Sequence, residues 1–123
     1  MIRYVGIDLH KHLIVAHILD EQGRTVGTAR CEPVTEQTLR EFAARHLRPD
    51  DHVAMEVTTH VWSVVRFLTP FVARIVVSNP LATKAIASAK VKTDKVDAQV
   101  LASLLRLDFL PSVWMPSPEQ SLM

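Results

Sequence analysis

The chain has 123 residues, the size of one ordinary domain, and 48% of them are apolar, which is enough to build a hydrophobic core. Its 14 basic and 13 acidic residues leave a formal net charge of +1, which neither requires nor excludes a nucleic-acid partner. The opening residues lack the pattern of a signal peptide, and no apolar run approaches the roughly 20 residues that span a bilayer. Together with a single cysteine, these features predict a cytoplasmic protein without disulfides or membrane contact.

The first third of the chain has the pattern of three β-strands, at residues 2–9, 13–19 and 24–31. β-Branched and aliphatic residues dominate the first strand, and residues 20–23 supply turn chemistry between the second and the third. Two short connections imply an antiparallel meander, in which the third and most polar strand is the edge. Cys31 ends that strand and is expected in the core, since free cysteines are usually buried.

Helical and strand patterns alternate along the rest of the domain. A helix is predicted after Thr35, a candidate N-cap whose capping box is incomplete because Thr38, and not Glu or Gln, stands three residues on. Strands are predicted at residues 52–57 and 72–77, a helix between them at residues 60–68, and a final helix from Asp94 to about Leu107. The order βββαβαβα predicts an α/β, ribonuclease-H-like fold: a mixed five-stranded sheet (three-stranded antiparallel meander plus two parallel strands) with helices on both faces.

The composition changes after Leu110, where prolines and serines become frequent. Pro111, Pro116 and Pro118 fall within eight residues. We therefore expect a domain at residues 1–110 and a linker or tail at residues 111–123, leading towards a C-terminal domain that this chain lacks.

The final helix carries two acidic residues. Its apolar stripe contains Leu101, Leu104 and Leu105, and positions three and four residues back along the same face lead to Asp97 and then Asp94. Both carboxylates are therefore expected to face the sheet at the start of the helix, where an isolated buried charge needs a partner. The alternative is that they only cap the helix, with Asp94 as N-cap and Asp97 at the third helical position.

Two further acids end predicted strands. Asp8 lies near the carboxyl end of the strand expected at the centre of the sheet, with Gly6 leaving room on the same face. Glu56 ends another strand, and functional groups collect beyond the carboxyl ends of parallel strands. The alternatives are a structural salt bridge for Asp8 and a solvent-facing strand end for Glu56.

Chemistry connects these acids. Four carboxylates, at Asp8, Glu56, Asp94 and Asp97, would repel one another without a cation. Mg²⁺ or Mn²⁺ prefers such oxygen ligands, and two ions about 4 Å apart can activate the attacking oxygen and stabilise the leaving one in phosphoryl transfer. The sequence therefore predicts a catalytic site that binds two metal ions.

A group of lysines lies next to these acids and would suit a polyanionic DNA backbone. The alternative is an ordinary solvated loop rich in lysine. Lys11, which follows the first predicted strand, is also expected to bind nucleic acid. The full set of lysines expected to do so is Lys11, Lys84, Lys90, Lys92 and Lys95.

These motifs resemble the N-terminal, RuvC-like domain of DEDD transposases of the insertion-sequence-110 family. The resemblance rests on residues 4–8 with Lys11, the Glu56 strand, residues 78–80 and, above all, the segment Lys-Thr-Asp-Lys-Val-Asp-Ala at residues 92–98. It implies DNA cutting and joining during transposition, with Asp8, Glu56, Asp94 and Asp97 at the family's four acidic positions. It also implies homo-oligomers, in many members a guide RNA encoded by the element, and a C-terminal domain with a serine nucleophile, without which this chain alone is expected not to transpose.

Three other functions are compatible with parts of the sequence. A sugar kinase or actin-like ATPase shares this fold, but it needs a phosphate-cradling glycine and hydroxyl residue where this chain has His10, Lys11 and His12. A stand-alone endonuclease of the Holliday-junction type would use the same four acids. A non-catalytic remnant or assembly module would bind no metal.

Overall fold

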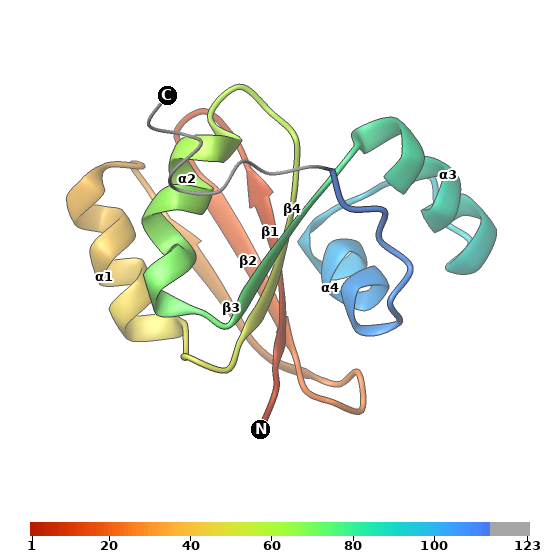
Figure 1. The fold of residues 1–123 in the computed structure, drawn as a ribbon, viewed down its shortest axis with the longest axis horizontal. Coiled ribbons are helices and arrows are strands. Elements are labelled where there is room, and N and C mark those ends of the chain that lie inside the picture. Colours follow the sequence, from red (N-terminus) through yellow and green to blue (C-terminus); the bar gives the residue numbers. More distant parts are fainter. Residues whose placement is uncertain (114–123) are drawn as a thin grey trace.

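The computed structural model describes residues 1–113, which form one sheet with helices on both of its faces (Figure 1). Five strands and four α-helices make up this region, together with a short 3₁₀ helix at Thr69–Phe71. In chain order they are β1 (Tyr4–Leu9), β2 (Ile14–Leu19), β3 (Thr25–Cys31), α1 (Glu36–His46), β4 (His52–Glu56), α2 (Val61–Leu68), β5 (Arg74–Ser78), α3 (Pro80–Lys90) and α4 (Ala98–Arg106).

The strands lie in the order β3-β2-β1-β4-β5, with β1 at the centre. β1, β2 and β3 pair antiparallel, while β4 pairs parallel with both β1 and β5. The predicted mixed sheet, its meander and the edge position of the third strand are therefore confirmed. The parallel arrangement brings the carboxyl ends of β1, β4 and β5 to the same end of the sheet, which is the top in Figure 1.

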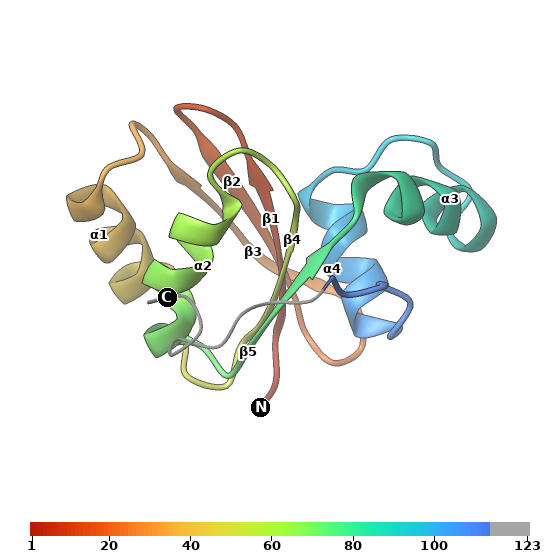
Figure 2. The same cartoon turned by 45° about the horizontal axis from the view of Figure 1, so that its top comes forward.

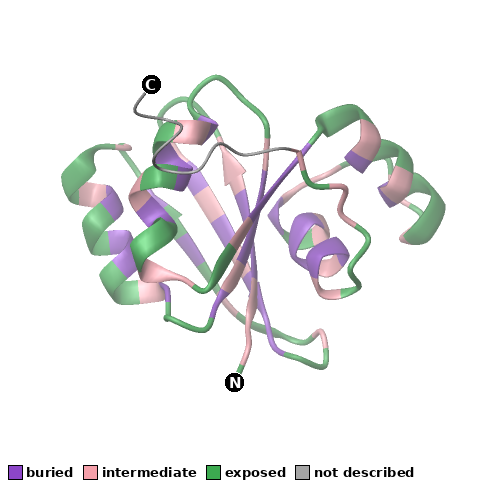
Figure 3. Ribbon diagram, viewed as in Figure 1, coloured by how far each residue is buried: buried purple, intermediate pink, exposed green. Residues whose placement is uncertain are grey.

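The two faces of the sheet have separate cores. Figure 2 shows α1 and α2 on one side of the strands and α4 on the other, and Figure 3 marks the buried residues. Val5 and Ile7 of β1 pack with residues of α1 and α2 on one face, together with Val53 of β4 and the buried Cys31. On the other face Ala54 packs against Leu101 and Leu105 of α4. Since successive strand residues point to opposite faces, this division also decides where the polar residues at the strand ends point.

Helix α3 was not predicted from the sequence, which suggested no helix or strand between residue 77 and Asp94. The side chain of Asn79 caps it by accepting hydrogen bonds from the amides of Leu81 (2.9 Å) and Ala82 (3.2 Å), and Pro80 occupies its first turn. Within the helix only Thr83 and Ala87 are buried, so it lacks the apolar stripe on which the prediction of the other helices depended.

The first turn of α1 also differs from expectation, because its capping box is complete. Thr38 Oγ1 accepts from the amide of Thr35 (2.8 Å), and Thr35 Oγ1 accepts from the amide of Thr38 (3.1 Å). The expectation of an incomplete box was wrong because a threonine hydroxyl can take the accepting role usually given to Glu or Gln.

Helix α4 approaches β1 closely at Gly6. A Cβ atom added to Gly6 would overlap the carbonyl oxygen of Ala98 and lie 2.7 Å from the amide nitrogen of Ala102. Gly6 therefore lets the backbone of the helix rest directly on the strand.

At the opposite end of the sheet a buried ion pair joins the N-terminus to the start of β4. Arg3 donates from Nε to Asp51 Oδ1 (2.9 Å) and from Nη2 to Oδ2 (2.8 Å), and a further bond runs from Nη2 to the carbonyl of His46. Asp51 is fully buried and also accepts from the amide of Arg48. This pair thus holds together β1, the end of α1 and β4.

The segment after α4 returns to the sheet. Ser112 forms an isolated antiparallel bridge with Ser78, and the amide of Val113 donates to the carbonyl of Val77 (2.8 Å). In the predicted linker at residues 111–123, Ser112 and Val113 therefore lie against β5, and residues 114–123 lie outside the described part of the chain. Within residues 1–113 no helix has the length and apolar character to cross a bilayer.

We predict that Gly6→Ala lowers the free energy of unfolding by about 3 kcal/mol, because the new methyl group meets backbone atoms of α4 that cannot move aside alone. Urea unfolding measures this. Gly27→Ala is the matched control, since its added Cβ meets only Ile18 Cδ1 at 3.7 Å, and it should change stability by less than about 0.5 kcal/mol. Equal effects of the two substitutions would contradict the steric account.

We predict that removing Asp51 lowers the free energy of unfolding more than Gly6→Ala does. Asp51→Ala leaves the guanidinium of Arg3 buried without its partner, which typically costs about 3–5 kcal/mol. Glu32→Ala, which removes the exposed pair with Arg30, should cost less than about 1 kcal/mol in the same urea experiment.

Candidate metal centre

Asp8 and Glu56 lie at the carboxyl ends of adjacent parallel strands. Gly6 of β1 is in register with Ala54 of β4, so the residues two positions further along are Asp8 and Glu56. Both lie on the face that α4 covers, because Gly6 contacts α4 and Ala54 packs against Leu101. The prediction that these two acids share one end of the sheet is confirmed.

The two carboxylates line the same small cavity, which has a volume of about 160 Å³. Leu101 of α4, Pro80 of α3 and Thr58 complete part of its wall. The side chain of Asp8 is 33% exposed, and its Oδ2 lies 3.2 Å from Nε2 of His10. The site is thus open enough for solvent and substrate to reach the acidic oxygens.

The electrostatic environment of this pair favours binding of a cation. Partial burial raises the pKa of Glu56 above its ordinary value of 4.5, and the nearby charge of Asp8 raises it further. Both causes act against the ionised form of Glu56. A divalent cation between the carboxylates would remove the repulsion and replace the lost solvation.

Asp97 and Asp94 are placed differently from the prediction. Helix α4 begins at Ala98 and not at Asp94, so the argument that both acids share one face of a helix is wrong. Asp97 is the N-cap, and its Oδ1 accepts from the amide of Val100 (3.0 Å). Asp94 is exposed in the segment before the cap. The capping alternative was therefore right in kind but assigned the N-cap to the wrong aspartate.

Asp97 lies near Asp8 and Glu56 but does not form a metal-binding cluster with them. Ala98, the residue after Asp97, touches Gly6, and Asp8 is two residues beyond Gly6. Among residues 1–113, however, no group of three or more His, Cys, Asp or Glu side chains is placed to hold a metal ion together. Two carboxylates are enough for Mg²⁺, which usually keeps several waters and takes substrate phosphates as its other ligands. The donor set of Asp8 and Glu56 therefore fits one such ion.

The predicted basic residues divide between three places. Lys84 and Lys90 lie on α3, Lys92 and Lys95 lie in the segment between α3 and α4, and Lys11 lies in the turn after β1. All five are exposed. Lys90 Nζ also lies over the ring of Phe109, 5.2 Å from its centroid, so part of its role is to hold the end of α3 against the segment after α4.

The contact of His10 with Asp8 was not predicted from the sequence. Its ring nitrogen reaches the carboxylate of Asp8, two residues away, because β1 ends at Leu9 and the chain turns there. Lys11 was expected to bind nucleic acid, but no contact with the acidic site was predicted for its neighbour His10. The position of His10 two residues after a strand-end aspartate was the available signal.

Comparison with known proteins agrees with this geometry. The family of DEDD transposases of the insertion-sequence-110 type, described as a transposase, matches residues 5–121. The chain belongs to this family. The transposase resemblance drawn from residues 4–8 and 92–98 is thereby confirmed. Among curated proteins none matches the chain closely enough to count as a relative.

Three solved structures are similar in fold to this transposase domain to different degrees. RuvC from T. thermophilus, solved in complex with a Holliday junction substrate, is 12% identical with a TM-score of 0.55, covering 92% of this chain and all of RuvC. The predicted ribonuclease-H-like, RuvC-like fold is confirmed by this likeness. The ethanolamine utilization protein EutJ from Carboxydothermus hydrogenoformans (20% identity, TM-score 0.44) and the polyphosphate/ATP-glucomannokinase from Arthrobacter sp. strain KM (19%, 0.46) are less similar in fold. The matches cover 69% and 77% of this chain, and only 39% and 51% of those two proteins.

The raised pKa of Glu56 gives a stability prediction with a definite sign. Because the folded state holds this proton more tightly than the unfolded chain, the stabilisation is complete below pH 4.5 and is lost as the pH rises through the raised pKa. With a chelator present, Glu56→Gln should therefore be more stable than the parent at pH 7 and similar to it at pH 4. Urea midpoints across this range measure the difference.

Glu41→Gln, at an exposed position of α1, is the matched control and should show no such gain at pH 7. A parent protein at least as stable as Glu56→Gln at pH 7 would contradict the electrostatic account of the pair.

Proposed function

We propose that this chain is the metal-binding N-terminal domain of a DNA transposase, which cuts and joins DNA phosphodiesters when an insertion sequence moves. The observation that carries the proposal is that Asp8 and Glu56 lie at the carboxyl ends of the adjacent strands β1 and β4 and line one cavity, in a chain of the transposase family. Mg²⁺, or Mn²⁺ in its place, is the cofactor that this donor set suits.

Asp8 and Glu56 would hold the first ion. Asp97 offers a second carboxylate oxygen, since only Oδ1 is engaged in capping, and Asp94 is exposed in the segment before α4. These two acids are our candidates for completing a second ion's ligands when DNA is bound. When bound, such ions activate the attacking oxygen and stabilise the leaving one.

The chain's own residues contribute position and charge. The strand ends fix the two carboxylates on the sheet, and Nε2 of His10, when it carries a proton, donates to the carboxylate of Asp8. We assign Lys11, Lys84, Lys92 and Lys95 to contacts with the DNA backbone, because they are exposed cations near or beside the acidic elements. A guide RNA and assembly into homo-oligomers remain predictions from the family resemblance.

Metal binding tests the proposal directly. Saturation with Mn²⁺, at about 100 times its dissociation constant, should stabilise the parent chain by about 2.7 kcal/mol, because only the folded state brings the two carboxylates together. Asp8→Asn keeps the shape of the side chain but removes its charge, and should lose most of this stabilisation. Calorimetric titration and urea unfolding with and without Mn²⁺ measure the two quantities.

The matched control is Asp108→Asn. Asp108 follows the carboxyl end of α4, and its φ of 61° is one that asparagine adopts readily. This variant should bind Mn²⁺ like the parent. If the parent shows no Mn²⁺ binding, or if Asp8→Asn binds it equally well, the metal-site proposal is wrong.

A further inference from the structure

A second cavity lies beside the acidic pair, on the side of the sheet that faces α2. Its volume is about 580 Å³. The turn after β1 and the loop between β4 and α2 supply its polar wall, and apolar residues including Ile14 and Val64 form the rest. We call it the histidine–lysine pocket, defined by His10, Lys11, His12, Thr58, Thr59 and His60.

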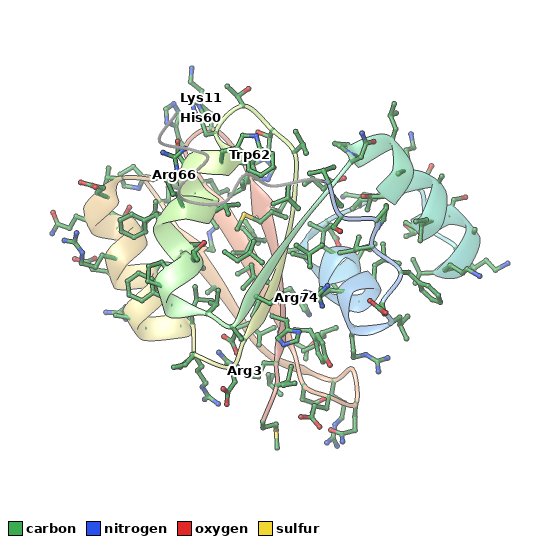
Figure 4. The ribbon with its side chains drawn as sticks, in the orientation of Figure 1. Arg3, Lys11, His60, Trp62, Arg66 and Arg74 are labelled. Atoms are coloured by element: carbon green, nitrogen blue, oxygen red, sulfur yellow. The ribbon has the colours of Figure 1, made fainter. Side chains whose placement is uncertain are left out.

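The pocket's polar wall is suited to an anion. Lys11 carries a full positive charge, three imidazoles and two threonine hydroxyls can donate hydrogen bonds, and no carboxylate belongs to the lining as far as residues 1–113 define it. All six polar residues are exposed, so they are available to a ligand. Lys11 and His60 lie close together at the top of α2 in Figure 4, with Trp62 and Arg66 further along the same helix.

The pocket adjoins the acidic site. Leu9 and Thr58 line both cavities, and His10 belongs to the pocket while its Nε2 lies 3.2 Å from the carboxylate of Asp8. A ligand that occupies both would therefore meet an acidic, cation-binding end and a basic end in two adjoining cavities. A nucleic-acid strand meets this requirement, because its phosphates can contact a metal ion at one end and basic side chains at the other.

The pocket's size and its mixed lining point to a nucleotide unit and not to a free anion. A volume of about 580 Å³ lies within the usual range for sites that hold whole small molecules. Apolar residues of the lining can contact a sugar or a base, while the polar wall contacts the phosphate. A free phosphate would leave most of this surface unused.

We propose that the histidine–lysine pocket binds a backbone phosphate, with its attached nucleoside, of the DNA strand that runs into the Asp8–Glu56 site. This inference rests on the proposed transposase function and adds a position for the strand next to the cutting site. Lys11 and His60 are the positioning residues: they hold the strand and do not touch the bond that is cut.

Binding of a short fluorescein-labelled single-stranded DNA, followed by fluorescence anisotropy in EDTA, tests the pocket without the metal site. Lys11→Ala and His60→Ala should each weaken binding several-fold. Lys11→Ala should also lower the slope of log affinity against log salt by about 0.7, because one phosphate contact is lost. Circular dichroism should show both variants folded, since both side chains are exposed.

Arg40→Ala is the matched control, because Arg40 is an exposed cation on α1 outside the pocket, and it should bind DNA like the parent. The proposal is overturned if both pocket variants bind like the parent, if Arg40→Ala loses as much affinity, or if RNA of the same sequence binds more tightly than DNA. Because the assay contains no free metal, its failure is distinct from a failure of Mn²⁺ to bind at Asp8.

Discussion

The direct contact between the backbone of α4 and Gly6 is the constraint on which the candidate site depends. It allows a helix to lie closer to the central strand than any side chain would permit. Asp8 follows this contact along β1, and Asp97 precedes it along α4. Two acids that are 89 positions apart in the sequence are thus anchored to the same point of contact. The proposed chemistry relies on a packing feature that itself carries no charge.

The two ends of the sheet differ in their electrostatics: one holds an ion pair of opposite charges, and the other holds two carboxylates. At the amino ends of β1 and β4, Arg3 and the buried Asp51 form an ion pair of opposite charges that is held by two hydrogen bonds, and Asp51 also accepts from the amide of Arg48. At the carboxyl ends, Glu56 is held in an environment that disfavours its own charge, with Asp8 as an unfavourable neighbour. Stability is therefore concentrated at one end, and the other end retains the unfavourable electrostatics that a ligand can relieve.

Much of the fold was predictable because its strands follow simple patterns. The alternation and turn residues of the first 31 positions predicted the meander, and the strand-end positions of Asp8 and Glu56 predicted that they would meet. The start of α4 was not predictable, because Asp94 and Asp97 are equally good caps three residues apart, and only the packing against Gly6 distinguishes them. Helix α3 escaped notice because it buries almost nothing, although the Asn79–Pro80 pair signalled its beginning.

The capping bond of Asp97 has a consequence for ligand binding. Once Oδ1 has accepted the amide of Val100, the torsion angles of the side chain are restricted, and the direction of its other oxygen is set by the helix. A metal or a water that uses that oxygen meets a group already immobilised by folding, so the usual loss of side-chain entropy on binding has already occurred. Asparagine, serine or threonine at this position would still cap the helix but would carry no negative charge. Such substitutions therefore separate the role of Asp97 in starting the helix from its role as an anionic ligand.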